Sequence, residues 1–479
     1  MSLHIILFYF QVKFNISHLY VLGFFVLISP DPLLMFVSGA VLLLTFKLMW
    51  RINEPKHLLV NLVLNWMVVA ILLPYGAIFQ KPLADLSIYK SDTIVYATWL
   101  AVLSQVFYLL GIYLPILNLV IPRTEKLQLI LSRYDGKKLF SAYVGYSFLS
   151  AILTPILLGI SGGQMLMGLV YFKWVFLTFL IIHTSIIPSN TKYVLLFVGF
   201  EILLSFSGFW SAFKDYILVA VGAFFTLNRK ITPKAVIATL LTISITFFIF
   251  VVWSASKGRY RAYLTGGARS QNVVQTDQVN NISILWNIVS EDFSSENFSE
   301  SFERGRDALL YRISYVEYFA LALKQVPTFI PHENGQLLQG ALEHVLKPRI
   351  LFPDKKVIYD SDITSKYTGV TFAGRDEGAS FSLGAVPEAY IDFGSVYMFL
   401  PVFFYGLLFG LMYKTLLLKG YNIVWGICYS APIFQYAWMF PVPGTKLLGW
   451  SITYFVNFYL INRYLVKYLD NWLLRKEFK

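Results

Sequence analysis

Charged residues are scarce in this chain of 479 residues. Asp, Glu, Lys and Arg together make up 14% of it, whereas 57% is hydrophobic and the mean hydropathy is +0.61. A soluble domain covers its core with polar side chains, so this composition excludes that class and indicates a polytopic membrane protein. Cysteine is also nearly absent, because Cys428 stands alone. A single cysteine excludes an intramolecular disulfide, a cysteine metal cluster and a CxxC redox pair.

Apolar runs long enough, or nearly long enough, to cross a bilayer as helices are abundant. They lie at about 16–29, 32–50, 57–80, 92–121, 139–160, 164–187, 191–207, 210–226, 234–254, 394–415, 421–442 and 447–468. The first run lacks a small-residue cleavage site, so we expect it to be retained as a span. We therefore expect an all-α polytopic membrane protein with about twelve transmembrane helices. Residues 1–254 would hold nine of them, 255–384 one large external loop, and 385–479 three more with a cytoplasmic tail.

Lys and Arg are distributed unevenly over the short connections. One set of loops, taken with the C-terminal tail, carries eighteen, and the alternate set carries three, namely Lys81, Lys90 and Lys446. Because basic residues stay on the cytoplasmic side of a membrane, this imbalance predicts that both termini are cytoplasmic and that 255–384 faces outward. The net charge of +12 is then a topology signal, and no nucleic-acid partner is expected.

Three basic residues follow the ninth run directly: Lys257, Arg259 and Arg261. They either anchor the helix end at the interface by snorkelling or bind an anionic substrate, and the sequence leaves both roles open. Residues 265–300 are rich in Gly, Ser, Asn and Gln, which predicts a mobile segment with helix only around 282–289.

Two short amphipathic helices are expected further along the loop. Apolar residues at helical spacing predict one over 303–324, with Arg312 at the margin of its apolar face. This helix would lie on the membrane surface or pack on the bundle. The second is expected over 335–346, with His344 near its C-terminus, where the helix dipole favours the imidazolium.

The densest cluster of charge precedes the tenth run. It comprises KPRILFPDKK at 347–356 and GRDEGASFSLGAVPEAYIDFG at 374–394. The pattern K-P-R-I-L-F-P-D-K followed by S-x-G-x-x-x-E-x-Y-x-D-F-G resembles the Wzy-type O-antigen polymerases, the oligosaccharide repeat-unit polymerases of bacterial envelopes. The resemblance covers about 350–415 closely, and the rest through helix count and one large late loop. It implies a GT-C-like fold in the inner (plasma) membrane.

The resemblance also implies a membrane glycosyltransferase that needs no cofactor. Such polymerases transfer a glycan from undecaprenyl diphosphate to a sugar hydroxyl of a new lipid-linked unit, and so build an O-antigen, a capsule or an exopolysaccharide. The implied partners are the undecaprenyl-diphosphate-linked oligosaccharide, the lipid bilayer and a chain-length regulator. Arginine suits the diphosphate leaving group because its planar fork donates two hydrogen bonds and keeps its charge. The candidates to bind the diphosphate are Arg349, Arg312, Arg259 and Lys355.

The acceptor hydroxyl is a poor nucleophile that benefits from a general base. Glu388 is the candidate, because it lies at the lip of the tenth span, and Arg375 is the second catalytic candidate. The alternative role for Glu388 is a structural ion pair with a nearby arginine. Tyr390, Tyr397 and His344 are the candidates to contact sugar, and no metal ligand is expected.

Two other functional classes stay open on the sequence. An O-antigen ligase-like glycosyltransferase shares the lipid-diphosphate chemistry. A polysaccharide flippase or transporter needs polar residues inside its spans and usually two related halves. The polar candidates within the spans are few, chiefly Glu201, Lys214 and Asp215, and no internal repeat is visible. This pattern weakens the transport interpretation.

Overall fold

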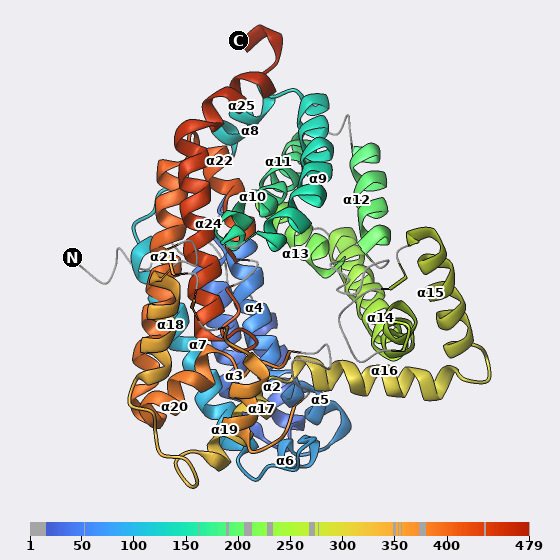
Figure 1. Ribbon diagram of the computed structural model, residues 1–479, viewed down its shortest axis with the longest axis vertical. Coiled ribbons are helices and arrows are strands. Elements are labelled where there is room, and N and C mark those ends of the chain that lie inside the picture. The colour runs from blue at the N-terminus through green and yellow to red at the C-terminus, as the bar shows by residue number, and fades with distance from the viewer. Residues whose placement is uncertain are drawn as a thin grey trace.

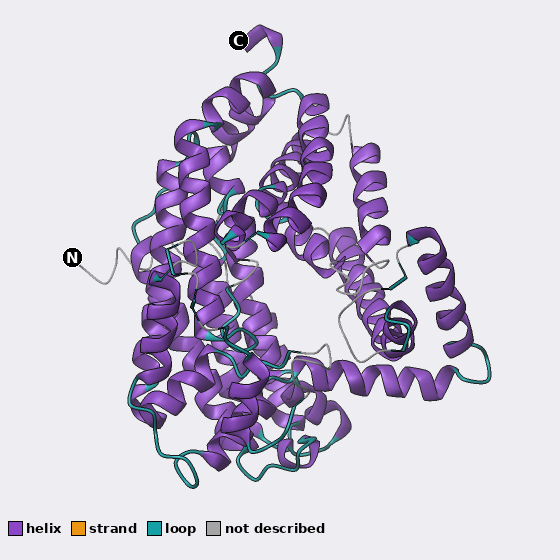
Figure 2. Ribbon diagram, in the orientation of Figure 1, coloured by secondary structure: helices purple, strands orange, loops and turns teal. Residues whose placement is uncertain are grey.

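The computed structural model describes residues 16–51, 53–160, 162–187, 191–205, 213–227, 233–267, 274–275, 277–347, 351–352, 354–355, 357–372, 380–434 and 437–478. This part of the chain is helical (Figures 1 and 2), apart from one isolated antiparallel bridge between Tyr134 and Leu474.

In chain order the helices are α2 (Ile16–Ile28), α3 (Pro32–Met49), α4 (His57–Ala70), α5 (Leu72–Phe79), α6 (Leu83–Leu86), α7 (Ile94–Ile116), α8 (Thr124–Ser132), α9 (Gly136–Gly159), α10 (Met167–Tyr171), α11 (Lys173–Ile186), α12 (Thr191–Ser205), α13 (Phe213–Phe224), α14 (Pro233–Leu264), α15 (Gln278–Asp292), α16 (Phe298–Ile313), α17 (Val316–Gln325), α18 (Gln336–Leu346), α19 (Asp360–Thr368), α20 (Ala385–Tyr397), α21 (Phe399–Lys419), α22 (Ile423–Cys428), α23 (Ser430–Phe434), α24 (Gly444–Tyr464) and α25 (Val466–Leu473).

Several of these helices are long and apolar enough to cross a membrane. Within the described residues there are five such spans: α3, α7, α9, the segment Gly163–Ile186 that ends with α11, and α21. Helices α4 and α5 make a sixth if they count as one span bent by 52°. The chain is therefore an all-helical protein with the apolar helices of a membrane protein.

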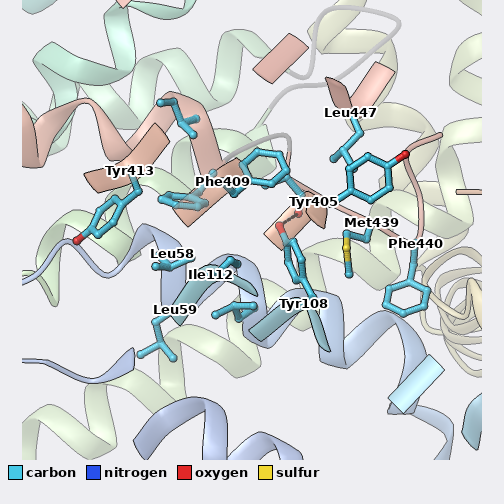
Figure 3. Packing of buried hydrophobic residues seen from close by; sticks show 14 of the residues in the cluster. Leu58, Leu59, Tyr108, Ile112, Tyr405, Phe409, Tyr413, Met439, Phe440 and Leu447 are labelled. Atoms are coloured by element: carbon cyan, nitrogen blue, oxygen red, sulfur yellow. Dashed lines mark hydrogen bonds between the residues drawn. The ribbon is translucent and has the colours of Figure 1, made fainter. Parts of the chain in front are cut away.

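The centre of the bundle is built on α7 and α21, which pack closely side by side. A Cβ atom added at Gly111 of α7 would lie 2.3 Å from the carbonyl oxygen of Phe403, and one added at Gly406 of α21 would lie 2.3 Å from that of Tyr108. Glycine permits such close approach of two helix backbones. In the surrounding core, the rings of Tyr108 and Phe409 meet edge to face, with centroids 6.2 Å apart (Figure 3).

The connections between helices gather at two opposite ends of the bundle (Figure 1). At the end that carries α6 and α19, the Ser87 hydroxyl and the Ile88 amide both donate to Glu317 of α17, at 2.9 and 3.1 Å. At the end that carries α8 and α25, the Tyr134 hydroxyl and the Trp425 indole both donate to Asp470, each at 2.6 Å. Buried carboxylates therefore tie the loops together at each end.

The helix expected over 303–324 is divided in the structure into α16 and α17. The break lies at Ser314 and Tyr315, where the Tyr315 amide donates to the carbonyl oxygen of Val68 at 3.1 Å. This contact turns the chain from α16 onto the bundle. The second expected helix is present as α18, with Gly335 as its N-cap.

Two other segments differ from the sequence-based expectation. Helix α15 is longer than the 282–289 helix expected in the mobile segment, of which residues 268–273 and 276 lie outside the described part. The apolar run 421–442 is divided between α22 and α23, and from 437 to 443 the chain is not helical.

Candidate active site

The first turn of α20 is fixed on the loop that precedes α24. Gly384 has φ of +94°, and a Cβ atom there would lie 1.8 Å from the carbonyl oxygen of Phe440. Only glycine permits this close approach with positive φ. The Ala385 amide then donates to the Val442 carbonyl oxygen at 2.9 Å. Gly384 of the S-x-G-x-x-x-E pattern therefore sets the position of Glu388, one turn further along.

Glu388 points at the N-terminus of α24. Its Oε2 accepts a hydrogen bond from the amide of Gly444, the first residue of that helix, at 2.7 Å. A Cβ atom added at Gly444 would lie 3.1 Å from this Oε2 and 2.7 Å from the hydroxyl oxygen of Tyr405. The carboxylate of Glu388 and the hydroxyl of Tyr405 therefore both lie close to Gly444.

The environment of Glu388 favours its neutral form. Burial raises the pKa of Glu388 to about 8, the negative charges of Asp360 and Asp392 act in the same direction, and the hydrogen bond from Gly444 opposes them. The described residues offer Glu388 no ion pair, because Lys446 contacts Asp360 instead, at 2.5 Å. A carboxyl group whose pKa lies this close to neutrality is suited to proton transfer.

Asp392, a weaker alternative to Glu388 on the sequence, has a structural partner. It is 2% exposed, and its two oxygens accept from the amides of Leu337 and Leu338 at 3.0 and 2.8 Å. These are orphan donors at the start of α18, so Asp392 caps that helix from α20. It thereby fixes α18 beside Glu388.

A pocket of about 650 Å³ lies between α18 and the segment 351–358. Its lining combines apolar side chains, such as Leu351 and Phe352, with the basic residues His344, Lys347 and Lys355 and the acidic residues Glu343 and Asp354. The Lys355 ammonium donates to the carbonyl oxygen of His344, so two of the predicted substrate-binding residues lie together here. Because the two carboxylates offset the two lysines, the apolar lining is the feature of this pocket that suits a lipid-like ligand.

Arg259, a predicted diphosphate ligand, is held by acidic neighbours. Its guanidinium contacts Glu291 and lies 2.9 Å from Asp292, which also accepts from Arg304 at 3.4 Å and from the Ser256 hydroxyl at 2.7 Å. This arrangement favours a structural role that joins α14, α15 and α16.

Arg312 lies with other cations. Burial, together with the charges of Arg312 and Arg261, lowers the pKa of Lys257 to about 8. We call Lys257, Arg261 and Arg312 the α14–α16 cation cluster. Its mutual repulsion favours a bound anion.

The two predicted sugar-contacting tyrosines have opposite surroundings. Tyr390 is 5% exposed, its hydroxyl donates to the carbonyl oxygen of Val326 at 2.8 Å, and its ring packs on Phe319 and His332. This placement favours a packing role for Tyr390 over the predicted sugar contact. Tyr397 is 71% exposed at the end of α20, which leaves its ring available.

The remaining site predictions fall on Arg349 and Arg375, which lie outside the described residues. Within the described part, no group of three His, Cys, Asp or Glu side chains is placed to hold a metal ion.

Residues 80–467 match the family model of a domain of unknown function, DUF8712. The chain belongs to this family. Neither the curated proteins nor the solved structures contain a match to the chain.

The DUF8712 match contains the whole Glu388 environment and the α18 pocket, and it begins just before α6. Because the family description names no activity, the evidence for function rests on the site itself.

The sequence singled out Glu388 as the candidate base, which stays a prediction, and it did not reveal the groups that surround this residue. Gly444 is 56 positions away along the chain, and Lys446 is 86 positions from Asp360. The sequence shows only a carboxylate near one apolar run and, after Pro443, a glycine at the start of another. Spacing in the sequence does not reveal that these two helix ends meet.

Proposed function

We propose that this DUF8712 protein polymerises lipid-linked oligosaccharide units in the inner (plasma) membrane, where Glu388 acts as the general base. The observation that carries the proposal is the position of this carboxyl group, which is partly buried at a helix N-terminus with a pKa near 8 and no ion-pair partner among the described residues. The resemblance of 350–415 to the Wzy-type polymerases supplies the substrate class.

In the proposed reaction, a sugar hydroxyl of the acceptor unit attacks the anomeric carbon of the donor glycan. The hydroxyl proton passes to the ionised form of Glu388, which is the minor form at neutral pH because its pKa is about 8, as the new C–O bond forms. The bond from the anomeric carbon to the diphosphate oxygen breaks, and undecaprenyl diphosphate leaves with the electron pair. The loss of a buried negative charge on Glu388 is favourable in this environment.

Basic groups close to the bundle stabilise the leaving diphosphate in this proposal. Lys355 in the α18 pocket and the α14–α16 cation cluster are the described candidates, and Arg349 and Arg375 remain predictions from the sequence. The apolar lining of the pocket suits the lipid end of the same substrate.

The proposal includes about twelve spans and an extracytoplasmic loop at 255–384. The pairing of Lys446 with Asp360 supports it, because these residues come from the two segments that the basic-residue count assigns to the same side. Helices α12, α13 and α14, which the five candidate spans do not include, supply further apolar segments.

The reaction class can be tested in cells that lack the gene. A polymerase defect leaves single repeat units on the final acceptor, a ligase defect leaves polymer on the lipid carrier, and a flippase defect traps units inside. We expect the first result. Either of the others would replace the proposed function.

The role of Glu388 is tested with the purified Glu388→Gln variant. Gln keeps the shape but cannot accept the proton, so turnover should fall by roughly two to four orders of magnitude, the usual value of general-base catalysis. Lipid-diphosphate affinity should change little. The matched control is Glu300→Gln, at an exposed carboxylate on α16 that lies outside the α18 pocket. Near-normal turnover of Glu388→Gln would refute the base assignment, and lost turnover together with unfolding would favour a structural role.

A further inference from the structure

The chain between α23 and α24 is not helical from 437 to 443, although most of this segment belongs to the apolar run 421–442. Backbone groups there have no partners within a helix, and lipid offers none. Asn65 of α4 is fully buried and supplies partners for two of these groups. Its Nδ2 donates to the carbonyl oxygen of Ala437 at 3.2 Å, and its Oδ1 accepts from the amide of Met439 at 3.0 Å.

Two further contacts fix this side-chain amide and the segment that it holds. The Oδ1 of Asn61, one helical turn earlier, accepts from Nδ2 of Asn65 at 3.1 Å. The Tyr108 hydroxyl of α7 donates to the carbonyl oxygen of Ala437 at 3.3 Å. The position of Asn65 thus requires a donor and an acceptor on one uncharged side chain, which asparagine has and leucine lacks.

The segment 437–443 is also the one against which α20 begins. The carbonyl oxygen of Met439 accepts from the Val386 amide at 3.3 Å, and that of Val442 accepts from the Ala385 amide at 2.9 Å. The segment leads directly into Gly444, whose amide donates to Glu388 at 2.7 Å. Hydrogen bonds and backbone therefore connect Asn65, inside the bundle, to both sides of the contact between Gly444 and Glu388.

We propose that Asn65 is a positioning residue for Glu388: it fixes the segment 437–443 and thereby holds the Gly444 amide against the carboxylate. Tyr108 assists through its hydrogen bond to the same segment. The catalytic meaning of this role rests on the proposed function, whereas the contacts themselves do not depend on it.

Infrared titration tests this role without an activity measurement, because a protonated carboxyl group has a C=O stretching band that a carboxylate lacks. Each form of the full chain, in lipid nanodiscs, is compared with its own Glu388→Gln derivative, so the difference reports Glu388. The hydrogen bond from Gly444 lowers the pKa of Glu388. If Asn65→Leu loosens this bond, the midpoint of the titration should move from about 8 to a higher pH. The other groups that face Glu388 are unchanged in these variants: Asp360 with its partner Lys446, Asp392 and Tyr405.

A second variant and a control keep the test independent of folding. Tyr108→Phe removes only a hydroxyl and should shift the midpoint in the same direction by less. Gln105→Leu is the matched control, since this buried amide donates to the carbonyl oxygen of Leu62 rather than to the segment 437–443. Gel filtration shows whether each variant is folded, and Tyr108→Phe decides if Asn65→Leu does not fold. A midpoint that stays at about 8 in the folded variants would overturn the proposal, as would an equal shift in Gln105→Leu.

Polymerisation of lipid-linked units by the same proteins separates this role from the proposed function. Misplacement of a catalytic group by about 1 Å costs roughly a hundredfold in rate, so kcat of Asn65→Leu should fall by about that factor with little change in KM. A shifted midpoint, with no polymerisation even by the unsubstituted protein, would support the positioning role and refute the proposed function. An unshifted midpoint, with normal polymerisation by the unsubstituted protein, would refute the positioning role alone.

Discussion

Glu388 experiences two opposing influences at the N-terminus of α24. The Gly444 amide favours the carboxylate, as helix N-termini do, whereas removal from water favours the neutral acid. Burial has the larger effect here, and the nearby Asp360 and Asp392 add to it. The consequence is a group that holds its proton over much of the pH range in which exposed glutamates are ionised.

The raised pKa of Glu388 predicts how the stability of the folded protein depends on pH. The folded chain keeps the Glu388 proton up to a pKa of about 8, whereas an unfolded chain releases it near 4.5. Between these values the folded state binds more protons, so this residue lowers the free energy of unfolding as the pH rises. Glu388→Gln lacks this titration, so its melting temperature should rise relative to that of the unsubstituted protein between about pH 5 and about pH 8.

Thermal unfolding in detergent at several pH values measures the effect. Glu300→Gln, at a carboxylate that is 84% exposed, serves as the control, since its difference from the unsubstituted protein should stay nearly constant with pH. A constant difference for Glu388→Gln as well would show that Glu388 titrates normally.

At the residue scale, the sequence places the carboxylate of Glu388 beside a span but does not reveal the helix N-terminus that it contacts. Its role as the general base stays a prediction. The packing role of Tyr390 was not predictable, because it depends on a hydrogen bond to Val326, 64 positions away.

At the scale of elements, α14, α15 and α16 form an arm beside the bundle (Figure 1). Close packing begins at Gly305 of α16, where an added Cβ atom would lie 2.4 Å from the carbonyl oxygen of Val251. Asp292 at the end of α15 then accepts hydrogen bonds from both α14 and α16. Sequence periodicity predicted helices in this arm, but the break at Ser314 depends on the contact of Tyr315 with Val68, which periodicity does not contain.

Substitutions of Asp292 and of Arg259 in this arm should lower the stability of the protein by different amounts. Asp292→Ala removes the acceptor that Ser256, Arg259 and Arg304 share, and should lower stability by about 1.5 to 3 kcal/mol, the range for hydrogen bonds to a charged group. Arg259→Ala should cost about 0.2 to 1 kcal/mol, because that side chain is half exposed. Faster amide hydrogen exchange across α15 in Asp292→Ala would report the loosened contact.

Arg306→Ala is the matched control, since Arg306 pairs only with its exposed neighbour Asp307 in the described contacts. Retained lipid-diphosphate affinity in Arg259→Ala would support the structural role. A large loss of affinity without loss of stability would instead restore Arg259 to the substrate site.

At the scale of the whole molecule, polar contacts join the loops into two groups at the two ends of the bundle, and the orientation of these ends in a membrane stays a prediction. Segments near Ser87, Glu317, Asp360 and Lys446 meet at one end, and segments near Tyr134, Asn422 and Asp470 meet at the other. Hydropathy predicted the helical class well. It did not predict that α4 and α5 bend by 52° or that α22 and α23 are short. In each place a proline, Pro74 or Pro432, stands four residues after the end of the preceding helix, where its ring removes the i to i−4 hydrogen bond and breaks the helix.

The orientation of these two ends decides whether Glu388 can meet a substrate outside the cell membrane, and cysteine labelling measures it. Cys428 is fully buried, so the unsubstituted protein should resist an impermeant thiol reagent and provides the blank. Ser295 lies at the connection of α15 and α16 and Ser132 at the end of α8, at different ends of the structure (Figure 1). Because eighteen of the basic residues in the connections and tail lie on the side of Ser132, we expect Ser295→Cys to react in intact cells and Ser132→Cys to react only after permeabilisation. Reversed accessibility would place Glu388 and the α18 pocket on the cytoplasmic side, and the proposed polymerisation outside the cytoplasm would then have no active site.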